Sequence, residues 1–232
     1  MNISFSPLGD QAIIIELGHE INEQTEQQVR KVAALLEHRQ PKWMTELIPA
    51  FVTVAIFYDP CLASYDQVKM ELEKLLAHLG EDISAESRAV EIPVCYGGEF
   101  GPDLEFVAQH NKLTTREVID IHTAGIYSVH MIGFAPGFPF IGGMSEKIAA
   151  PRRDSPRLRI PERTVGIAGM QTGVYPIETP GGWQLIGRTP LRLFRPENTI
   201  PSLLRAGDKI IFREISEDDY YTWEEDPDAE NP

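Results

Sequence analysis

Two segments rich in glycine, proline and aromatic residues constrain the fold of this chain most strongly. Residues 130–144 read HMIGFAPGFPFIGGM, with four glycines, three phenylalanines and two prolines in fifteen positions. A second segment of the same character, YPIETPGGWQLIGRTP, covers residues 175–190. Both are too apolar for ordinary surface loops, and glycine and proline break them too often for a helix. They predict rigid loops that need no regular hydrogen-bond ladder.

The sequence around these segments predicts a small barrel or sandwich. Helical periodicity ends near residue 124, and short apolar runs such as TVGIAG, WQLIG, LRLF and DKIIF then alternate with turns. Residues 101–124 are expected to form two short helices before the barrel. Thr114 and Glu117 are spaced as a capping box that opens the second of these helices.

The first part of the chain instead alternates strands and helices. A helix over residues 22–38 is predicted to open at Asn22, and Ser64 and Gln67 form a capping box for the next helix. The order βαββαβ that results is the ferredoxin-like pattern. Its expected elements are a strand at 11–17, the helix at 22–38, two strands within 43–59, a helix at 64–79 and a strand at 88–96, which could serve either domain.

The expected fold class is therefore α+β, with two domains and a tail. Residues 1–85 form the ferredoxin-like domain, and polar residues 80–88 mark the seam. Residues 86–215 form the second domain, a β-barrel or a sandwich, with its two leading short helices. Residues 216–232 are acidic and are predicted to be disordered.

Composition excludes several classes of protein. The net charge of -14 argues against nucleic acid as a partner. No apolar run approaches the roughly 18 residues of a membrane span, and the N-terminus lacks the features of a signal peptide, so the expected location is cytoplasmic. Cys61 and Cys95 fit no metal-ligand spacing, and no metal site is expected.

Positive charge is concentrated in one block. Residues 151–213 hold 11 basic and 5 acidic side chains, and ten of the cations are arginine. The planar guanidinium suits the recognition of carboxylate or phosphate, which favours an anionic ligand. The alternative is a solvated barrel surface.

Motifs of a self-sufficient catalyst are absent from the sequence. It contains no G-x-x-x-x-G-K-[ST], no G-x-S-x-G and no H-E-x-x-H. Its six histidines show no ligand clustering. His122 falls near a predicted helix end, where it would cap a carbonyl. His130 opens the first glycine-rich segment, where it either serves a small ligand as a proton donor or bonds a loop carbonyl.

The two glycine-rich segments predict a groove for a ligand or a partner. Aromatic side chains would line its wall, and the polar residues between the segments would line its floor. The alternative is that the aromatic side chains fill the barrel core. The candidate groove residues are His130, Phe134, Pro136, Phe138, Arg153, Arg157, Gln171, Thr172 and Trp183; no catalytic residue is assigned.

Three stretches carry a resemblance to a known family. They read PLGDQAIIIELG, HTAGIYSVHMIGFAPGFPFIGGM and SPRLRIPERTVGIAGMQTGVYPIETPGGWQLIGRTP. They resemble the family of 5-oxoprolinase B-type subunits, which includes allophanate hydrolase subunit 1-like proteins and Kip-type inhibitors of a sporulation histidine kinase, and the overall sequence favours the Kip type. The resemblance spans residues 4–213. One departure is Arg163-Thr164, where the family often has a Gly-Ser turn.

This resemblance implies a cyclophilin-like barrel and a place in an ATP-dependent enzyme. The chain would be one subunit of a hydrolase that opens the cyclic amide 5-oxoproline to glutamate, and it would be inactive alone. The partners implied are the other 5-oxoprolinase subunits, including the C-type subunit, which is the Kip-operon antagonist. ATP would be shared with or bound by those partners, and the arginine-rich block would stabilise the transferred phosphoryl group.

The same resemblance implies a second role of a different class. The chain would bind the dimerisation domain of a sensor histidine kinase and inhibit its autophosphorylation, either in addition to the enzymatic role or as its sole function. A third reading, a peptide binder like a prolyl isomerase, rests on fold likeness alone.

Overall fold

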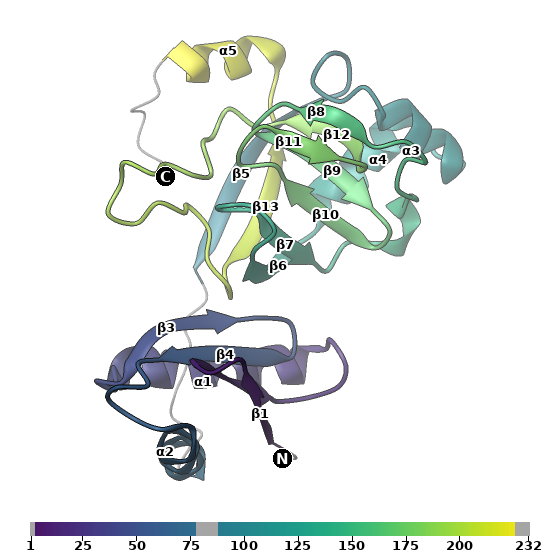
Figure 1. Ribbon diagram of the computed structural model, residues 1–232. Helices are drawn as coiled ribbons and strands as arrows, with labels where there is room; N and C mark the ends of the chain where they lie inside the picture. The colour runs from purple at the N-terminus through teal and green to yellow at the C-terminus, as the bar shows by residue number, and fades with distance from the viewer. Residues whose placement is uncertain (1–2, 78–87, 226–232) are drawn as a thin grey trace. The chain divides into compact units, whose positions relative to one another are not determined.

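The computed structural model describes residues 3–77 and 88–225 (Figure 1). The chain divides into two compact units, residues 1–87 and 88–232. The predicted domain boundary after residue 85, and residues 80–87 of the predicted seam, lie outside the described residues.

The first unit is a four-stranded antiparallel sheet with two helices on one face (Figure 1). The strand order is β1-β2-β4-β3. Apolar positions of both helices, among them Val29, Leu36 and Leu72, pack on Ile15 and Ile56 of the central strands. The elements are β1 (Ser4–Leu8), β2 (Ala12–Glu16), α1 (Glu23–Arg39), β3 (Met44–Pro49), β4 (Thr53–Tyr58) and α2 (Tyr65–Ala77).

Side-chain caps start both helices where the sequence predicts. The Asn22 side chain accepts a hydrogen bond from the backbone N–H of Thr25 at 2.9 Å. At α2 the backbone N–H of Ser64 donates to Gln67 Oε1 at 2.8 Å. These bonds satisfy amide groups that have no partner within the helix.

The element order of this unit differs from the predicted βαββαβ. The strand at 88–96 belongs to the barrel, and the edge position beside β2 is held by β1, which pairs with β2 from Ser4 to Leu8. The described order is therefore ββαββα. The short strand β1 escaped sequence analysis because its residues SFSPL are mostly exposed and include a proline, which is uncommon within strands.

The second unit is built on a closed seven-stranded barrel in the order β10-β7-β6-β13-β5-β12-β9. The strand pairs are antiparallel except β5 and β13, which run parallel in register from Ala89 with Lys209 to Val94 with Glu214. The barrel strands are β5 (Ala89–Tyr96), β6 (Tyr127–Ile132), β7 (Pro139–Gly142), β9 (Thr164–Ala168), β10 (Gln171–Val174), β12 (Gln184–Arg188) and β13 (Lys209–Glu214).

Two short helices precede most of the barrel strands, as predicted. They are α3 (Leu104–His110) and α4 (Thr115–Ala124), and the capping box of Thr114 with Glu117 is present at α4. A 3-10 turn, η1 (Glu146–Ile148), and a two-stranded sheet of β8 (Arg157–Ile160) with β11 (Thr179–Gly181) complete the periphery. The predicted strand LRLF is wrong: it contributes one isolated bridge, from Phe194 to Ser202.

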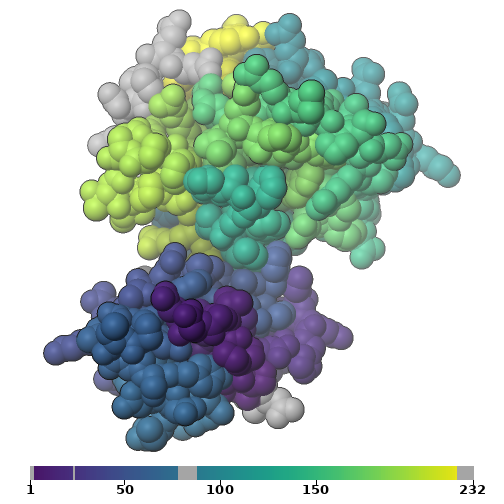
Figure 2. Space-filling model, in the orientation of Figure 1, coloured from purple at the N-terminus to yellow at the C-terminus, as the bar shows by residue number. Residues whose placement is uncertain are grey.

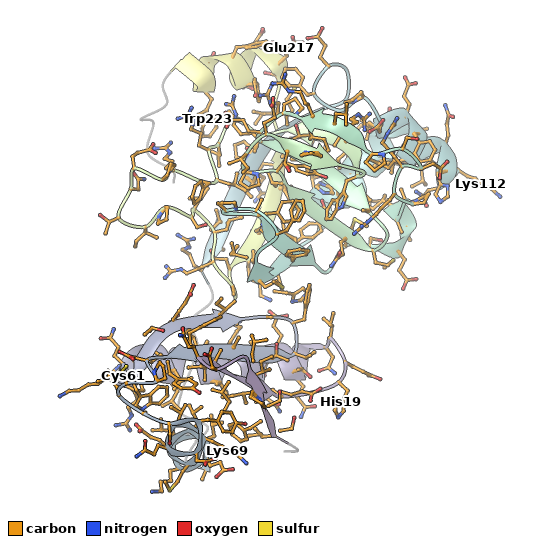
Figure 3. All side chains as sticks on the ribbon, in the orientation of Figure 1. His19, Cys61, Lys69, Lys112, Glu217 and Trp223 are labelled. Atoms are coloured by element: carbon orange, nitrogen blue, oxygen red, sulfur yellow. The ribbon has the colours of Figure 1, made fainter. Side chains whose placement is uncertain are left out.

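Part of the predicted disordered tail is ordered. Residues Glu217–Glu225 form helix α5, which is capped by Ser216 through its bond to the Asp219 amide at 3.1 Å. Tyr220 is buried against Phe100, and Trp223 packs on the barrel core (Figure 3). The aromatic residues of an otherwise acidic sequence therefore anchor the helix. The remaining tail residues, 226–232, lie outside the described part.

Candidate functional site

An aromatic cluster joins the two glycine-rich segments. The ring centroid of Phe138 lies 5.5 Å from that of Tyr175 and 5.8 Å from that of Trp183. All three side chains are buried and pack with Ile160 and Leu185. The segments therefore meet through packed side chains, and Phe138 and Trp183 fill a core instead of lining an open wall.

The close packing of this cluster depends on glycine. A Cβ atom at Gly181 would lie 2.5 Å from Tyr175 Oη and 2.8 Å from Ile160 Cδ1. At the neighbouring Gly182 the nearest atoms would be 3.8 Å away. The first glycine of the PGGW motif is thus required by packing, whereas the second is not.

Two predicted site residues, Arg153 and Arg157, converge on Asp103. Nη2 of Arg157 donates to Asp103 Oδ1 at 2.8 Å, and Nη1 of Arg153 donates to the same oxygen at 3.3 Å. The other carboxylate oxygen, Oδ2, accepts from the backbone N–H of Leu185 at 2.7 Å. Asp103 is buried, and Leu185 belongs to the aromatic cluster. Asp103 therefore holds both guanidinium groups at the edge of this cluster.

Sequence analysis missed Asp103. It stands directly before α3, where an aspartate is ordinarily an N-cap, yet its side chain makes no capping bond. Its partners lie 50 and 54 positions away in the chain. No local pattern indicates such a pairing.

The loop between β6 and β7 presents Phe134 and Pro136 to solvent. The Phe134 side chain is 71% exposed, and its φ of 70° lies in the left-handed region that bulky residues rarely adopt. Backbone bonds from Gly133 N to Phe138 O and from Phe138 N to Ala135 O, each 3.0 Å long, hold this conformation. Such conformations cluster at functional sites, although Gln40, Lys112 and Arg163 of this chain also have a positive φ.

The same loop lies beside the segment that contains Phe194 and Ser202. A Cβ atom at Gly137 would come within 2.9 Å of Phe194 Cβ and 3.3 Å of Ser202 Oγ. Figure 2 shows residues 130–144 in teal next to the yellow-green residues of this segment on one face of the unit.

His130 lies on β6 and is half-buried. Its imidazole packs across Gly142 of the neighbouring strand β7, so that a side chain at position 142 would collide with the ring. This contact explains one glycine of the first segment.

Thr172 lies inside the barrel rather than on a groove floor. Its hydroxyl donates to Gly166 O at 3.1 Å, so it accepts from Nε2 of the buried His122 at 2.9 Å. Nδ1 of His122 then accepts from Tyr96 Oη at 2.7 Å. The ring is neutral, because burial lowers the pKa of His122 to about 3. The side chain of His122 thus bonds two other side chains instead of capping a helix carbonyl.

The structure therefore separates the candidate residues into three places. Phe138 and Trp183 lie in the aromatic cluster with Arg153 and Arg157 at its edge. Phe134 and Pro136 lie on the exposed loop, from which the Phe134 ring contacts Phe138 of the cluster, with 5.5 Å between the ring centroids. The remaining three lie on barrel strands: His130 on β6, and Gln171 and Thr172 on β10, where Gln171 is half-buried and pairs with Ala168.

The described residues offer no metal centre. Within 3–77 and 88–225, no group of three or more His, Cys, Asp or Glu side chains could hold a metal ion. Nor does any helix of these two ranges have the length and apolar character needed to cross a membrane.

The sequence of this chain is similar to those of known proteins along nearly its whole length. The chain is 55% identical over 229 residues to the B-type subunit of 5-oxoprolinase from Bacillus subtilis, covering 94% of this chain and 95% of the relative. The chain belongs to the family of 5-oxoprolinase B-type subunits. A second member, from Escherichia coli O157:H7, is 39% identical over 88% of this chain and 93% of its own.

A family model and a solved structure also match this chain. Residues 3–204 match the family model of the carboxyltransferase domain, subdomain C and D. A conserved uncharacterized protein from Pyrococcus horikoshii is 46% identical, covers 94% of this chain and 100% of its own, and superposes with a TM-score of 0.57.

Proposed function

We propose that the chain is a subunit of an ATP-dependent 5-oxoprolinase, which converts 5-oxoproline, ATP and water to glutamate, ADP and phosphate. The observation that carries this proposal is the 55% identity to a protein named as the B-type subunit of 5-oxoprolinase, over 95% of that protein's length. Similarity of this extent covers both compact units and both glycine-rich segments.

The reaction requires that the lactam be activated before water can open it. An unstrained lactam opens slowly in water. Phosphorylation of its amide oxygen activates the ring carbon: water adds to that carbon, the C–N bond breaks with the nitrogen leaving as the amine, and a second water hydrolyses the resulting acyl phosphate to glutamate and phosphate. This chain has no P-loop sequence. We therefore assign nucleotide binding to a site shared with, or held by, the partner subunits.

Reconstitution tests the proposal. The chain alone is expected to show no 5-oxoproline-dependent ATP hydrolysis, whereas the chain mixed with its partner subunits is expected to release phosphate and glutamate in equal amounts. An assembly that reaches full activity without this chain would refute the proposal.

A second candidate function is the docking of a protein partner, and Phe134 favours it. An exposed aromatic side chain on a strained, hydrogen-bonded loop is typical of the anchors that carry binding energy at protein interfaces. The dimerisation domain of a sensor histidine kinase is the partner we propose. Kinase autophosphorylation measured with and without the full chain tests this role, and unchanged autophosphorylation at saturating chain concentration refutes it.

A further inference from the structure

The arginine pair at Asp103 has more hydrogen-bond donors than its carboxylate can use. A guanidinium carries five N–H groups. Arg157 gives Asp103 one bond from Nη2, and Arg153 gives one bond from Nη1. The other oxygen, Oδ2, accepts from Leu185 N–H, so both arginines share the single oxygen Oδ1. The carboxylate therefore orients the two guanidinium groups and uses only one N–H donor of each.

One of these donors is already shielded from water. Nη1 of Arg157 is buried, and no atom of the described residues accepts a hydrogen bond from it. A buried donor without an acceptor costs free energy that an incoming oxygen atom recovers. The atom therefore marks a position where a ligand oxygen is favoured.

The charge of the site selects a small monoanion. The two guanidinium groups and the carboxylate that they contact have a net charge of about +1, and Arg152 adds positive charge outside this group, where it acts on Tyr175 together with Arg157. That charge matches one carboxylate, whereas a triphosphate would bring several negative charges to the buried Asp103.

The position of the pair allows a small ligand to enter from solvent. The Arg153 side chain is 37% exposed and that of Arg157 is 24% exposed. Arg153 belongs to residues 151–156, an exposed segment without regular secondary structure, which is held to the second glycine-rich segment by a bond from Arg153 N to Gly182 O at 2.7 Å.

We infer that Arg157, with Arg153, binds the carboxylate of 5-oxoproline. This inference rests on the proposed function and changes the role expected for the two arginines, from stabilising a transferred phosphoryl group to holding the substrate. Asp103 is the positioning residue of this subsite.

The test uses the chain assembled with its partner subunits and carrying Arg157→Lys. Lysine keeps the positive charge beside Asp103 but loses the second guanidinium nitrogen, so the fold is retained. We expect the KM for 5-oxoproline to rise about 10- to 100-fold, the range of one charge-assisted hydrogen bond. The KM for ATP is expected to stay unchanged. Inhibition by pyrrolidin-2-one, the same lactam without the carboxylate, is also expected to stay unchanged.

The matched control is Arg159→Lys on the same strand, β8. Arg159 is exposed and pairs with Glu178 instead of Asp103.

Three results would overturn the inference. They are a rise in the KM for ATP with Arg157→Lys, an equal loss of affinity for the lactam that lacks the carboxylate, and an unchanged KM for 5-oxoproline. Calorimetric titration of the same assemblies with 5-oxoproline measures the affinity of the subsite in the absence of turnover. An inactive wild-type assembly that still binds 5-oxoproline through Arg157 would count against the proposed function alone.

Discussion

Arg157 and Asp103 are joined by a hydrogen bond of 2.8 Å between Nη2 and Oδ1, although 54 positions separate them in the chain. The bond ties the start of β8 to the start of α3. Asp103 also accepts from Leu185 N–H on β12, so one buried carboxylate fixes three parts of the second unit.

Loss of the Asp103 charge is expected to destabilise the second unit. Asp103→Asn leaves two guanidinium groups without their buried counter-charge, and because both are partly exposed this costs about 1 to 3 kcal/mol. Hydrogen exchange of the β12 amides measures this cost. The control is Asp154→Asn, at an exposed position, with an expected effect within about 0.5 kcal/mol. Equal protection in the two variants would contradict the prediction.

The two glycines of the PGGW motif are expected to respond differently to alanine. Gly181→Ala places a methyl group against Tyr175 and Ile160, and such overpacking costs about 1 to 3 kcal/mol. Gly182→Ala meets no atom closer than 3.8 Å and is expected to be tolerated. Thermal unfolding compares the two variants. If Gly182→Ala lowers the melting temperature as much as Gly181→Ala, the packing argument is wrong.

The buried His122 is expected to make the second unit sensitive to acid. Burial lowers the pKa of His122 from 6.5 to about 3, so between these values the unfolded chain binds a proton that the folded chain does not. Stability therefore falls as the pH drops through this window, by about 1.4 kcal/mol per pH unit.

Hydrogen exchange of the β10 amides at several pH values measures this dependence. His122→Asn is expected to flatten it, and His110→Asn, at an exposed position, is expected to preserve it. A wild-type slope that persists in His122→Asn would assign the effect to another group.

Phe134→Gly is expected to separate stability from partner binding. Glycine adopts a positive φ without strain, which offsets the lost ring contact with Phe138, so stability changes by less than about 1 kcal/mol. Affinity for a protein partner is expected to fall at least about tenfold, because the exposed aromatic anchor is gone. Biolayer interferometry with the kinase dimerisation domain checks the affinity.

Lys112→Gly is the matched control for Phe134→Gly. Lys112 also has a positive φ, 58°, and projects from the turn after α3 (Figure 3). This variant is expected to keep its partner affinity. Parallel losses of affinity in both variants would show that Phe134 has no special role.

Local patterns predict the elements of this fold well and their partners poorly. Asn22, Ser64 and Thr114 mark helix starts because a cap acts within three residues of itself. The strand at 88–96 is predictable from its own residues, but its membership in the barrel depends on β13, more than 100 positions later. Pairing at such distances is decided by the closed sheet as a whole.

The candidate site follows the same division. The glycine-rich segments are recognisable in sequence, and their meeting through Phe138 and Trp183 agrees with their shared composition. The burial of Thr172 and the role of Asp103 were not predictable, because each depends on a partner from a distant element: His122 for Thr172, and Arg157 for Asp103.

The parallel pairing of β5 with β13 has a consequence for how the chain is made. β5 is the first barrel strand to leave the ribosome and β13 is the last, so the edges of β5 and β6 stay unpaired until residue 214 has emerged. A chain that stops short of Lys209 cannot close its barrel and presents two open strand edges to its neighbours. The chain must therefore be synthesised through its last strand before the barrel can close. Incomplete chains keep exposed strand edges, which can pair with other chains and cause aggregation.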